Sequence, residues 1–361
     1  MNPDLLQISL GTTRGLRIAD GWFAKLVCQA GVSIETVGVR VGATNRLRRA
    51  YPVTDLVEAL AARRATTSAL TRLEPGALVF STTTASLLTG DPGVPYAVRL
   101  DSPARLNRPG MHNVALHALE RRKLAKAALV LPWSVASAAA LPPDAGPVVV
   151  VPPPLLVPTD SKPTGARERL AVAYTPDPKA KGLDLLCRAW ALAAVPGARL
   201  EVFGVDRARA LRRLRRTGVP EPPNVHWAGS VAPGDFHSRL ARSVTFVTSA
   251  RWEDFGMTQL EALALGVLLV CTATEGPFEA GAIARELNPK LVAADQTPEA
   301  LASGIDEAFN LGATAADSYR RAAWSRLERY RPGAIAHTIA EQVLPVLLGS
   351  RRCSGAQLSG G

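Results

Sequence analysis

The sequence lacks any long uncharged hydrophobic run. None of its apolar stretches reaches the roughly eighteen residues that a transmembrane helix needs. The first residues, "MNPDLLQISLGTTRG", also lack a basic start followed by a long apolar stretch, so we expect no signal peptide. These absences predict a cytoplasmic protein, with peripheral contact at the inner membrane face left open.

Histidine and cysteine are scarce, with five His and four Cys among 361 residues. The cysteines show no metal-ligand spacing and the histidines form no cluster, so the sequence predicts no metal and no cofactor. Cys28, Cys187 and Cys271 lie in apolar runs, where we expect reduced thiols in the core. Reduced thiols would fit a reducing compartment.

Acidic residues are outnumbered, and the formal net charge is +11. The basic residues peak locally in "RLRR" (46–49), "ERRKLAK" (120–126) and "RARALRRLRR" (207–216). A solvated helix face, an anionic membrane surface or substrate, and nucleic acid all remain open as explanations. No aromatic residues are interleaved with these arginines and no nucleic-acid motif accompanies them, so we expect no nucleic-acid partner.

What the sequence does contain is a regular alternation of short apolar runs with longer Ala-, Leu- and Arg-rich segments of helical spacing. The runs that we interpret as buried strands are "DLLQISL", "SIETVGVR", "GALVFST", "PYAVRL", "AALVLP" and "GPVVVVP", then "LAVAYT", "ARLEVFG", "NVHWAG", "VTFVTSA", "GVLLVCTA" and "PKLVAAD". Strands that alternate with helices predict βαβ units and mostly parallel sheets.

The alternation breaks once, at the proline-rich "VVVVPPPLLVPTDSKPTGARERL". We therefore predict two doubly wound, Rossmann-like α/β domains, over residues 1–157 and 169–331, joined by a linker at 158–168. A final helix, 332–349, should pack back on the N-terminal domain, and the tail 350–361 should be disordered. Two such domains would face a cleft, where strand ends and helix N-termini bind nucleotides and phosphates.

The stretch "RWEDFGMTQLEALALG" (251–266) carries the most specific chemistry. It is expected to form a loop and then a helix, whose free amides around Gly256, Met257 and Thr258 could hold an anion. Glu261, one turn further in, could accept bonds from the two hydroxyls of a ribose, and Glu253 would meet what lies beyond the phosphates. Alternatively, Glu253 is a solvated loop acid and Glu261 pairs with an arginine.

The surrounding sequence, "SARWEDFGMTQLEALALGVLLVCTATEGPFEAG", resembles the signature of the retaining GT-B glycosyltransferases of family 4, the glycosyl transferases group 1. The matching residues are Ser249, Glu253, Phe255, Gly256, Glu261, Ala262, Ala264, Gly266, Gly276 and Glu279. "KAKGLDLLCRAW", "LEVFG", "NVHWAGSV" and, more loosely, "RRKLAKAALVLPWS" resemble further segments in the family's order. The resemblance covers the C-terminal domain well and the N-terminal domain loosely, and it implies a GT-B fold.

The resemblance also implies roles. Glu261 would bind the ribose, Glu253 the transferred sugar, and Lys181 the pyrophosphate, whose charge grows as the anomeric bond breaks. The remaining donor-binding candidates are the glycines and neighbours at strand ends, with two further charged residues: Gly11, Lys179, Gly204, Gly229, Val231 and Glu279. Glu279 is equally explained as an acid at a helix start, and Lys181 alternatively as a solvated loop lysine.

Three positions depart from the family's pattern. Thr175 stands near the position of a frequent arginine, and Lys179 could supply the missing cation. Gly11 and Gly15 are separated where relatives commonly have a Gly-Gly pair. Asp101 stands where many relatives have a histidine; it could orient a sugar hydroxyl or accept its proton, or simply cap a turn. The loop from Asp101 to Gly110 is expected to define the acceptor.

The sequence thus predicts a metal-independent, retaining hexosyl-type glycosyltransferase of polysaccharide biosynthesis. The C-terminal domain would hold the nucleotide-diphosphate sugar, and the N-terminal domain the acceptor: a glycan, a lipid-linked glycan or a small molecule. Two alternatives remain: a non-catalytic GT-B scaffold or glycan-binding subunit, and a GT-B sugar-nucleotide epimerase.

Overall fold

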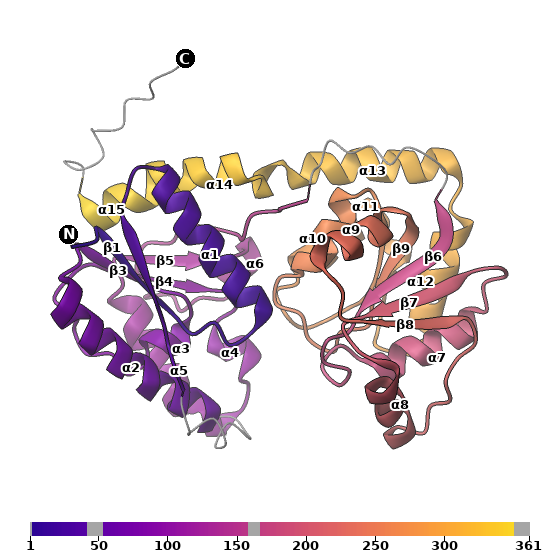
Figure 1. Ribbon diagram of the computed structural model, residues 1–361, viewed down its shortest axis with the longest axis horizontal. Helices are drawn as coiled ribbons and strands as arrows, with labels where there is room; N and C mark the ends of the chain where they lie inside the picture. Colours follow the sequence, from indigo (N-terminus) through magenta and orange to yellow (C-terminus); the bar gives the residue numbers. More distant parts are fainter. Residues whose placement is uncertain (1, 42–52, 158–166, 350–361) are drawn as a thin grey trace, which may run out of the picture. The chain divides into compact units, whose positions relative to one another are not determined.

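The computed structural model describes residues 2–41, 53–157 and 167–349 (Figure 1). It divides into two compact units, Met1–Pro154 with Tyr330–Gly361, and Leu155–Arg329. The basic run at 46–49, Cys353, the tail at 350–361 and all but the last two residues of the predicted linker lie outside the described residues.

The first unit is a five-stranded parallel sheet of order β2-β1-β3-β4-β5 with helices on both faces. Its strands are β1 (Leu5–Ser9), β2 (Ile34–Gly38), β3 (Ala77–Phe80), β4 (Tyr96–Leu100) and β5 (Leu129–Pro132). Its helical segments are α1 (Arg14–Gln29), α2 (Val53–Leu73), α3 (Thr83–Ser86), α4 (Ala104–Asn107), η2 (Met111–Asn113), α5 (Val114–Ala125), α6 (Val135–Ala139), α14 (Pro332–Thr338), η5 (Ile339–Val343) and α15 (Leu344–Leu348).

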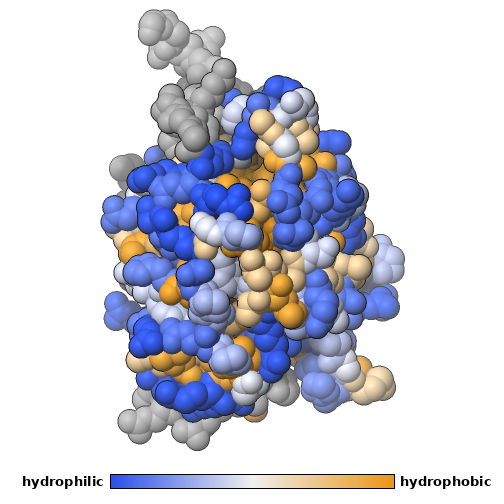
Figure 2. All heavy atoms as spheres, turned by 90° about the vertical axis from the view of Figure 1, so that its right-hand side faces the viewer, coloured by the Kyte–Doolittle hydropathy of each residue, from blue (hydrophilic) through white to orange (hydrophobic). Residues whose placement is uncertain are grey.

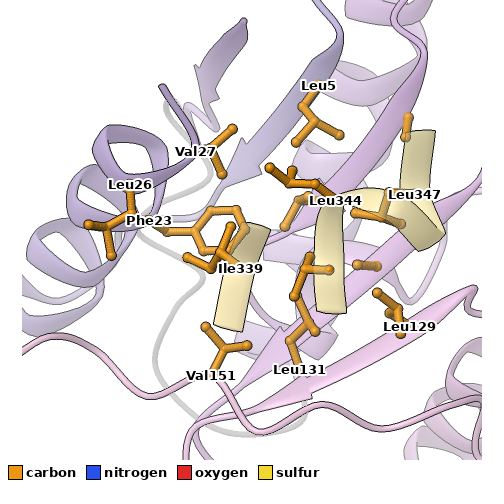
Figure 3. Close-up of a cluster of buried hydrophobic side chains, with 14 of the residues drawn as sticks. Leu5, Phe23, Leu26, Val27, Leu129, Leu131, Val151, Ile339, Leu344 and Leu347 are labelled. Atoms are coloured by element: carbon orange, nitrogen blue, oxygen red, sulfur yellow. The ribbon is translucent and has the colours of Figure 1, made fainter. Parts of the chain in front are cut away.

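Both faces of this sheet are apolar because successive side chains of a strand point to opposite sides. Leu5 and Val79 pack with α1, α14 and α15 (Figure 3), whereas Leu6 and Phe80 pack in a second cluster with residues of α2 and α5. Ile339 of the last helical segment is fully buried in the first of these clusters. The C-terminal segment is thereby part of the core of the first unit.

The second unit is a six-stranded parallel sheet of order β11-β10-β9-β6-β7-β8. Its strands are β6 (Glu168–Tyr174), β7 (Arg199–Phe203), β8 (Val225–Gly229), β9 (Ser243–Thr248), β10 (Leu268–Thr272) and β11 (Val292–Ala293). Its helical segments are α7 (Leu183–Ala193), α8 (Arg207–Arg216), α9 (Pro233–Ala241), α10 (Met257–Ala264), α11 (Glu279–Leu287), η3 (Pro289–Leu291), α12 (Pro298–Asn310), α13 (Ala313–Leu327) and η4 (Glu328–Tyr330). α7 contacts α8 and α12, while α10 contacts α11 and α13, so helices again cover both faces (Figure 1).

The predicted α/β fold class is confirmed, and four local predictions are corrected. "GPVVVVP" is not a strand: Val148 makes only an isolated bridge to Val130, since the flanking prolines cannot donate to a ladder. β2 is only partly buried because it is an edge strand. The predicted helix at 332–349 contains a π-helical turn, η5, because Pro345 has no amide to continue the helix.

The fourth correction concerns the cysteines. Cys187 and Cys271 are buried as predicted, but Cys28 is exposed. Its apolar neighbours Leu26 and Val27 face the core from α1, and Cys28 lies around the helix from them. An apolar run therefore predicted the helix correctly and the environment of its thiol wrongly.

A charged pair lies inside the first unit. Arg99 of β4 is 1% exposed, and its Nη1 lies 2.9 Å from Oδ1 of Asp20 on α1. Ser9 also donates to the Asp20 carboxylate, and the guanidinium stacks over Phe23 with its carbon 4.5 Å from the ring centroid. Burial lowers the pKa of Arg99, and Asp20 opposes that shift. The pair is thus integral to the packing of α1 on the sheet.

Within the described residues, no helix combines the length and hydropathy needed to cross a membrane. The face drawn in Figure 2 interleaves hydrophilic and apolar residues. On α8 the arginines at 207, 209, 212, 215 and 216 are all exposed. That helix therefore presents a concentrated basic surface, which we call the α8 arginine face.

Candidate functional site

The carboxyl ends of β6 and β9 form a topological switch point in the second sheet. The two strands are neighbours although β7 and β8 separate them in sequence, and the chain continues from them toward opposite edges of the sheet. Open parallel sheets bind ligands beyond the strand ends at such a point. The loop after β6 carries Lys181, and the loop after β9 carries Glu253.

The structure brings these two predicted catalytic residues together. Lys181 Nζ lies 2.7 Å from Glu253 Oε2, and Gln259 Nε2 donates to the same oxygen at 2.9 Å. The Lys181 and Glu253 side chains are 26% and 14% exposed, so a ligand can still reach them. Gln259 itself is 5% exposed. The site therefore holds a carboxylate between a cation and an amide donor.

Two glycines allow the loops at the switch point to approach closely. A Cβ on Gly182 would lie 2.1 Å from the Ser249 carbonyl oxygen, and a Cβ on Gly276 would lie 2.1 Å from that of Glu253. The Ser249 hydroxyl lies 2.9 Å from the carbonyl oxygens of both Lys181 and Gly182 and donates to them. These contacts fix the backbone on which the Lys181–Glu253 pair is mounted.

Helix α10 begins at the switch point, as predicted. Gly256 precedes it with φ +88°, a left-handed conformation, and a Cβ there would meet the Phe278 ring at 2.5 Å. No side chain caps the helix, so the first amides, at Met257 and Thr258, are not capped by a protein side chain. A helix N-terminus of this kind attracts anions.

Glu261 lies further along α10 and is 18% exposed at its side chain. Its Oε2 lies 3.2 Å from Nε2 of His237 on α9. No contact joins Glu261 to Lys181 or Glu253 in the described part of the chain. The alternative expectation, an arginine partner for Glu261, is not what the structure contains, because the partner is a histidine.

The other donor-side candidates surround the same sheet edge. Gly204 and Gly229 follow β7 and β8 with φ +84° and +66°, and the Gly204 amide donates to the Gly229 carbonyl at 2.7 Å. Val231 lies two residues beyond Gly229. The side chain of Lys179 is exposed, and Thr175 is buried with no hydrogen-bond partner for its hydroxyl. Cations are therefore available near β6, although none occupies position 175.

Glu279 is the first residue of α11 and is 7% exposed. Its carboxylate forms an ion pair with the Arg329 guanidinium. The carboxylate is therefore engaged within the protein, which favours the positioning of this loop over direct contact with a sugar.

Gly11 and Asp101 belong to the first unit. Gly11 follows β1 with φ +51°, and its carbonyl accepts a bond of 2.7 Å from Arg17 Nη1. Asp101 follows β4, and its Oδ1 accepts a bond of 2.8 Å from the amide of Ser102. Both therefore lie at carboxyl ends of strands, at positions where such sheets bind ligands.

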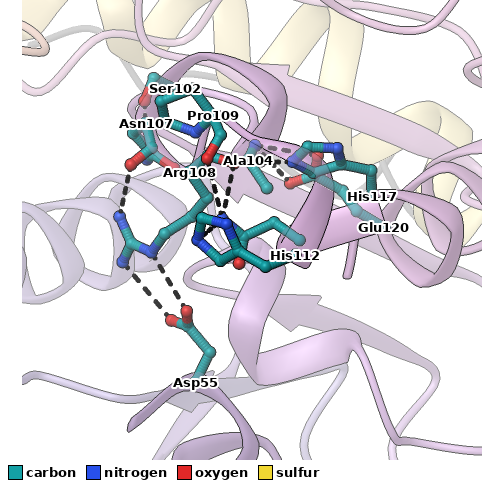
Figure 4. Close-up of polar contacts among 10 residues, drawn as sticks. Asp55, Ser102, Ala104, Asn107, Arg108, Pro109, His112, His117 and Glu120 are labelled. Carbon is teal, nitrogen blue, oxygen red and sulfur yellow. Dashed lines mark hydrogen bonds and ion pairs between the residues drawn. The ribbon is translucent and has the colours of Figure 1, made fainter. Parts of the chain in front are cut away.

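The loop that follows Asp101 is rigidly braced (Figure 4). Arg108 binds Asp55 of α2 through Nε and Nη2, at 3.1 and 3.4 Å. Asn113 donates to the carbonyl oxygen of Arg108, and His117 Nε2 lies 2.9 Å from the same oxygen. Glu120 accepts from the Ala104 amide, and burial raises the pKa of Glu120. The predicted acceptor loop thus presents a preorganised surface.

Gln259 and His237 were not predicted from the sequence. Gln259 interrupts the apolar stripe of α10, and a buried polar residue beside a candidate carboxylate was the available signal. His237 carries no local signal, since its neighbour Glu261 is 24 positions away. Among the described residues, no group of three or more His, Cys, Asp or Glu side chains could hold a metal ion.

Comparison with known proteins agrees with this geometry. The family model for glycosyl transferases group 1 matches residues 161–324, which include the Lys181–Glu253 pair and Glu261. No curated protein matches the sequence.

Several solved structures share the fold. Sucrose-phosphate synthase from Thermosynechococcus elongatus has a TM-score of 0.68 at 15% identity, covering 93% of this chain and 96% of its own. Anabaena HepE in complex with UDP-glucose has a TM-score of 0.67 at 16% identity, with 93% and 98% covered. S. aureus TarM in complex with fondaparinux, α-GlcNAc-glycerol and UDP has a TM-score of 0.60 at 12% identity, with 76% of this chain covered. This chain spans only 57% of the TarM chain. The two Rossmann-like domains therefore constitute the GT-B fold, and the segment 161–324 matches the glycosyl transferases group 1.

Proposed function

We propose that this protein is a glycosyltransferase that moves a sugar from a nucleotide-diphosphate donor to an acceptor hydroxyl with retention of anomeric configuration. The observation that carries the proposal is the Lys181–Glu253 pair at the switch point of the domain that the family model matches. A cation and an acid fixed beside an uncapped helix N-terminus suit a diphosphate with a sugar attached.

In the proposed complex, each donor group has a partner in the second unit. The diphosphate exchanges with Glu253 for the ammonium of Lys181 and lies at the amides of Met257 and Thr258. The carboxylate of Glu261 accepts bonds from the ribose hydroxyls, and Glu253, freed from Lys181, accepts from the sugar. Lys179, Gly204, Gly229, Val231 and Gly11 would complete the donor site.

The proposed reaction is a front-face substitution. The bond between the anomeric carbon and the diphosphate oxygen breaks as the acceptor oxygen bonds to the same carbon from the same side. The acceptor proton passes to the departing diphosphate oxygen, so the step needs neither an enzymic nucleophile nor a metal. Lys181 and the helix amides stabilise the charge that grows on the diphosphate.

The first unit would supply the acceptor side. Asp101 and the braced loop after it are proposed to orient the acceptor hydroxyl. TarM was crystallised with glycan-like and glycerol-linked ligands, and HepE with UDP-glucose. By analogy we propose transfer of a hexose to a glycan or lipid-linked glycan in polysaccharide biosynthesis, in the cytoplasm or at the inner membrane face.

A thermal-shift panel with UDP, GDP, ADP and dTDP, without metal, tests the proposal. Ligand binding to the native state raises the melting temperature. We expect one nucleotide to raise that of the wild type and to have little effect on Glu261→Ala. Glu299→Ala removes an exposed carboxylate of the same domain and should respond like the wild type.

The non-catalytic alternative is favoured by one observation. Lys181 and Glu253 already satisfy each other in the absence of ligand, as in a structural ion pair. If no nucleotide raises the melting temperature and Glu261→Ala changes nothing, the scaffold interpretation replaces the enzymatic one.

A further inference from the structure

His237 faces the carboxylate to which the ribose is assigned. The 3.2 Å between His237 Nε2 and Glu261 Oε2 is within ion-pairing and hydrogen-bonding distance. The two side chains are 28% and 18% exposed. A ligand can therefore reach the pair without displacing either helix.

The position of His237 is set by the packing of α9. Its neighbour Phe236 is 8% exposed, with its ring centroid 5.2 Å from that of Phe203 and 5.7 Å from that of Tyr174. Leu240, one turn later, is fully buried. These two anchors fix the rotation of the helix, so His237 points consistently toward α10.

The two acids of the site differ in how they are held. Glu253 has two donors on Oε2, Lys181 and Gln259. Glu261 has His237 as its side-chain partner, and the part of the chain that the structure describes offers it no other. The orientation of the Glu261 carboxylate therefore depends on a single imidazole.

We propose that His237 is a positioning residue that fixes Glu261 for recognition of a ribose diol, so that the donor is a ribonucleotide and not a deoxyribonucleotide. The inference rests on the proposed donor site. With Nε2 of His237 engaged at Oε2, Oε1 and the remaining lone pairs of Oε2 accept bonds from the 2′- and 3′-hydroxyls. A carboxylate free to rotate would bind the diol less selectively, because ordering it costs conformational entropy.

The test compares ribose with deoxyribose in matched variants. Calorimetry would give the affinities of UDP and 2′-deoxy-UDP, or of the corresponding pair for the base that the wild type prefers. In His237→Ala the preference for the ribonucleotide should fall about tenfold, the loss typical of one hydrogen bond to a charged group. His237→Gln places an amide nitrogen near the position of Nε2 and should retain most of the preference. His226→Ala, at an exposed histidine of the same domain, should leave it unchanged.

The outcomes separate this inference from the proposed function. If Glu261→Gln abolishes the ribose preference while His237→Ala retains it, the donor site stands and the role of His237 is overturned. Equal weakening of both nucleotides in His237→Ala would indicate a merely structural histidine and would overturn it too. If neither nucleotide of any base binds the wild type, the donor site and this inference fail together.

Discussion

At the scale of single residues, Lys181 is the group whose removal should affect chemistry most. Its ammonium is 2.7 Å from Glu253 and is proposed to stabilise the leaving diphosphate. We predict that Lys181→Ala lowers kcat by roughly 10²–10³-fold, the effect of removing one preorganised donor from a developing charge. The measurement is the rate of nucleotide release from the sugar nucleotide that binds. Lys290→Ala, at an exposed lysine, is the control; equal rates in both variants would contradict the role.

The thiols should differ sharply in reactivity. Burial raises the pKa of Cys187 and of Cys271 to about 12, so neither forms a thiolate near neutral pH, while Cys28 is exposed. In a Cys353→Ser background, we predict that a thiol reagent labels one cysteine of the native protein rapidly. Cys28→Ser should abolish that labelling, and denaturant should expose the other two. Rapid labelling of two or more thiols in native Cys28→Ser would be inconsistent with the packing.

The residues that the sequence could identify were those in a continuous motif. Glu253, Gly256 and Glu261 follow one another along a strand, a loop and a helix, so their spacing alone places them at one sheet edge. His237 could not be found this way, because its contact with Glu261 depends on the rotation of α9 against a different element. Residue roles that arise from tertiary packing leave no local periodicity.

At the scale of secondary-structure elements, the Asp20–Arg99 pair secures α1 on the sheet. Removing one member of a buried pair leaves an uncompensated charge, whose cost is about 3–5 kcal/mol. We predict that Asp20→Ala lowers the free energy of unfolding by that amount in denaturant titrations. Asp144→Ala breaks the exposed pair with Arg121 and should change it by less than about 1 kcal/mol. Similar small losses in both variants would mean that Arg99 finds other compensation.

Elements were predictable where local pattern and tertiary environment agree. Buried parallel strands such as β1 and β3 are continuous apolar runs, and each was located. The runs beside prolines were not reliable: 146–152 has strand composition, but its prolines limit it to an isolated bridge. At the C-terminus, the apolar spacing predicted a helix correctly, while the effect of Pro345 on its regularity required the structure.

At the scale of the whole molecule, the net charge of +11 requires an explanation that single ion pairs do not give. Arg207 of the α8 arginine face pairs with Glu221, but Arg209, Arg212 and Arg216 are exposed without an acidic partner among the described residues. A solvated face and an anionic membrane surface remain the two explanations, and they differ in their dependence on salt and lipid.

The membrane explanation predicts that the protein sediments with phosphatidylglycerol vesicles at about 0.1 M salt and dissociates at about 1 M, as the Debye length falls from about 10 Å to about 3 Å. Phosphatidylcholine vesicles should not bind it. Changing Arg209, Arg212 and Arg216 together to Glu should abolish sedimentation, because each basic residue near an anionic surface contributes about 1 kcal/mol. Changing Arg285, Arg321 and Arg326 to Glu alters the net charge equally at other exposed positions. Equal loss in both triple variants would assign binding to total charge, and no sedimentation of the wild type would leave α8 as a solvated helix.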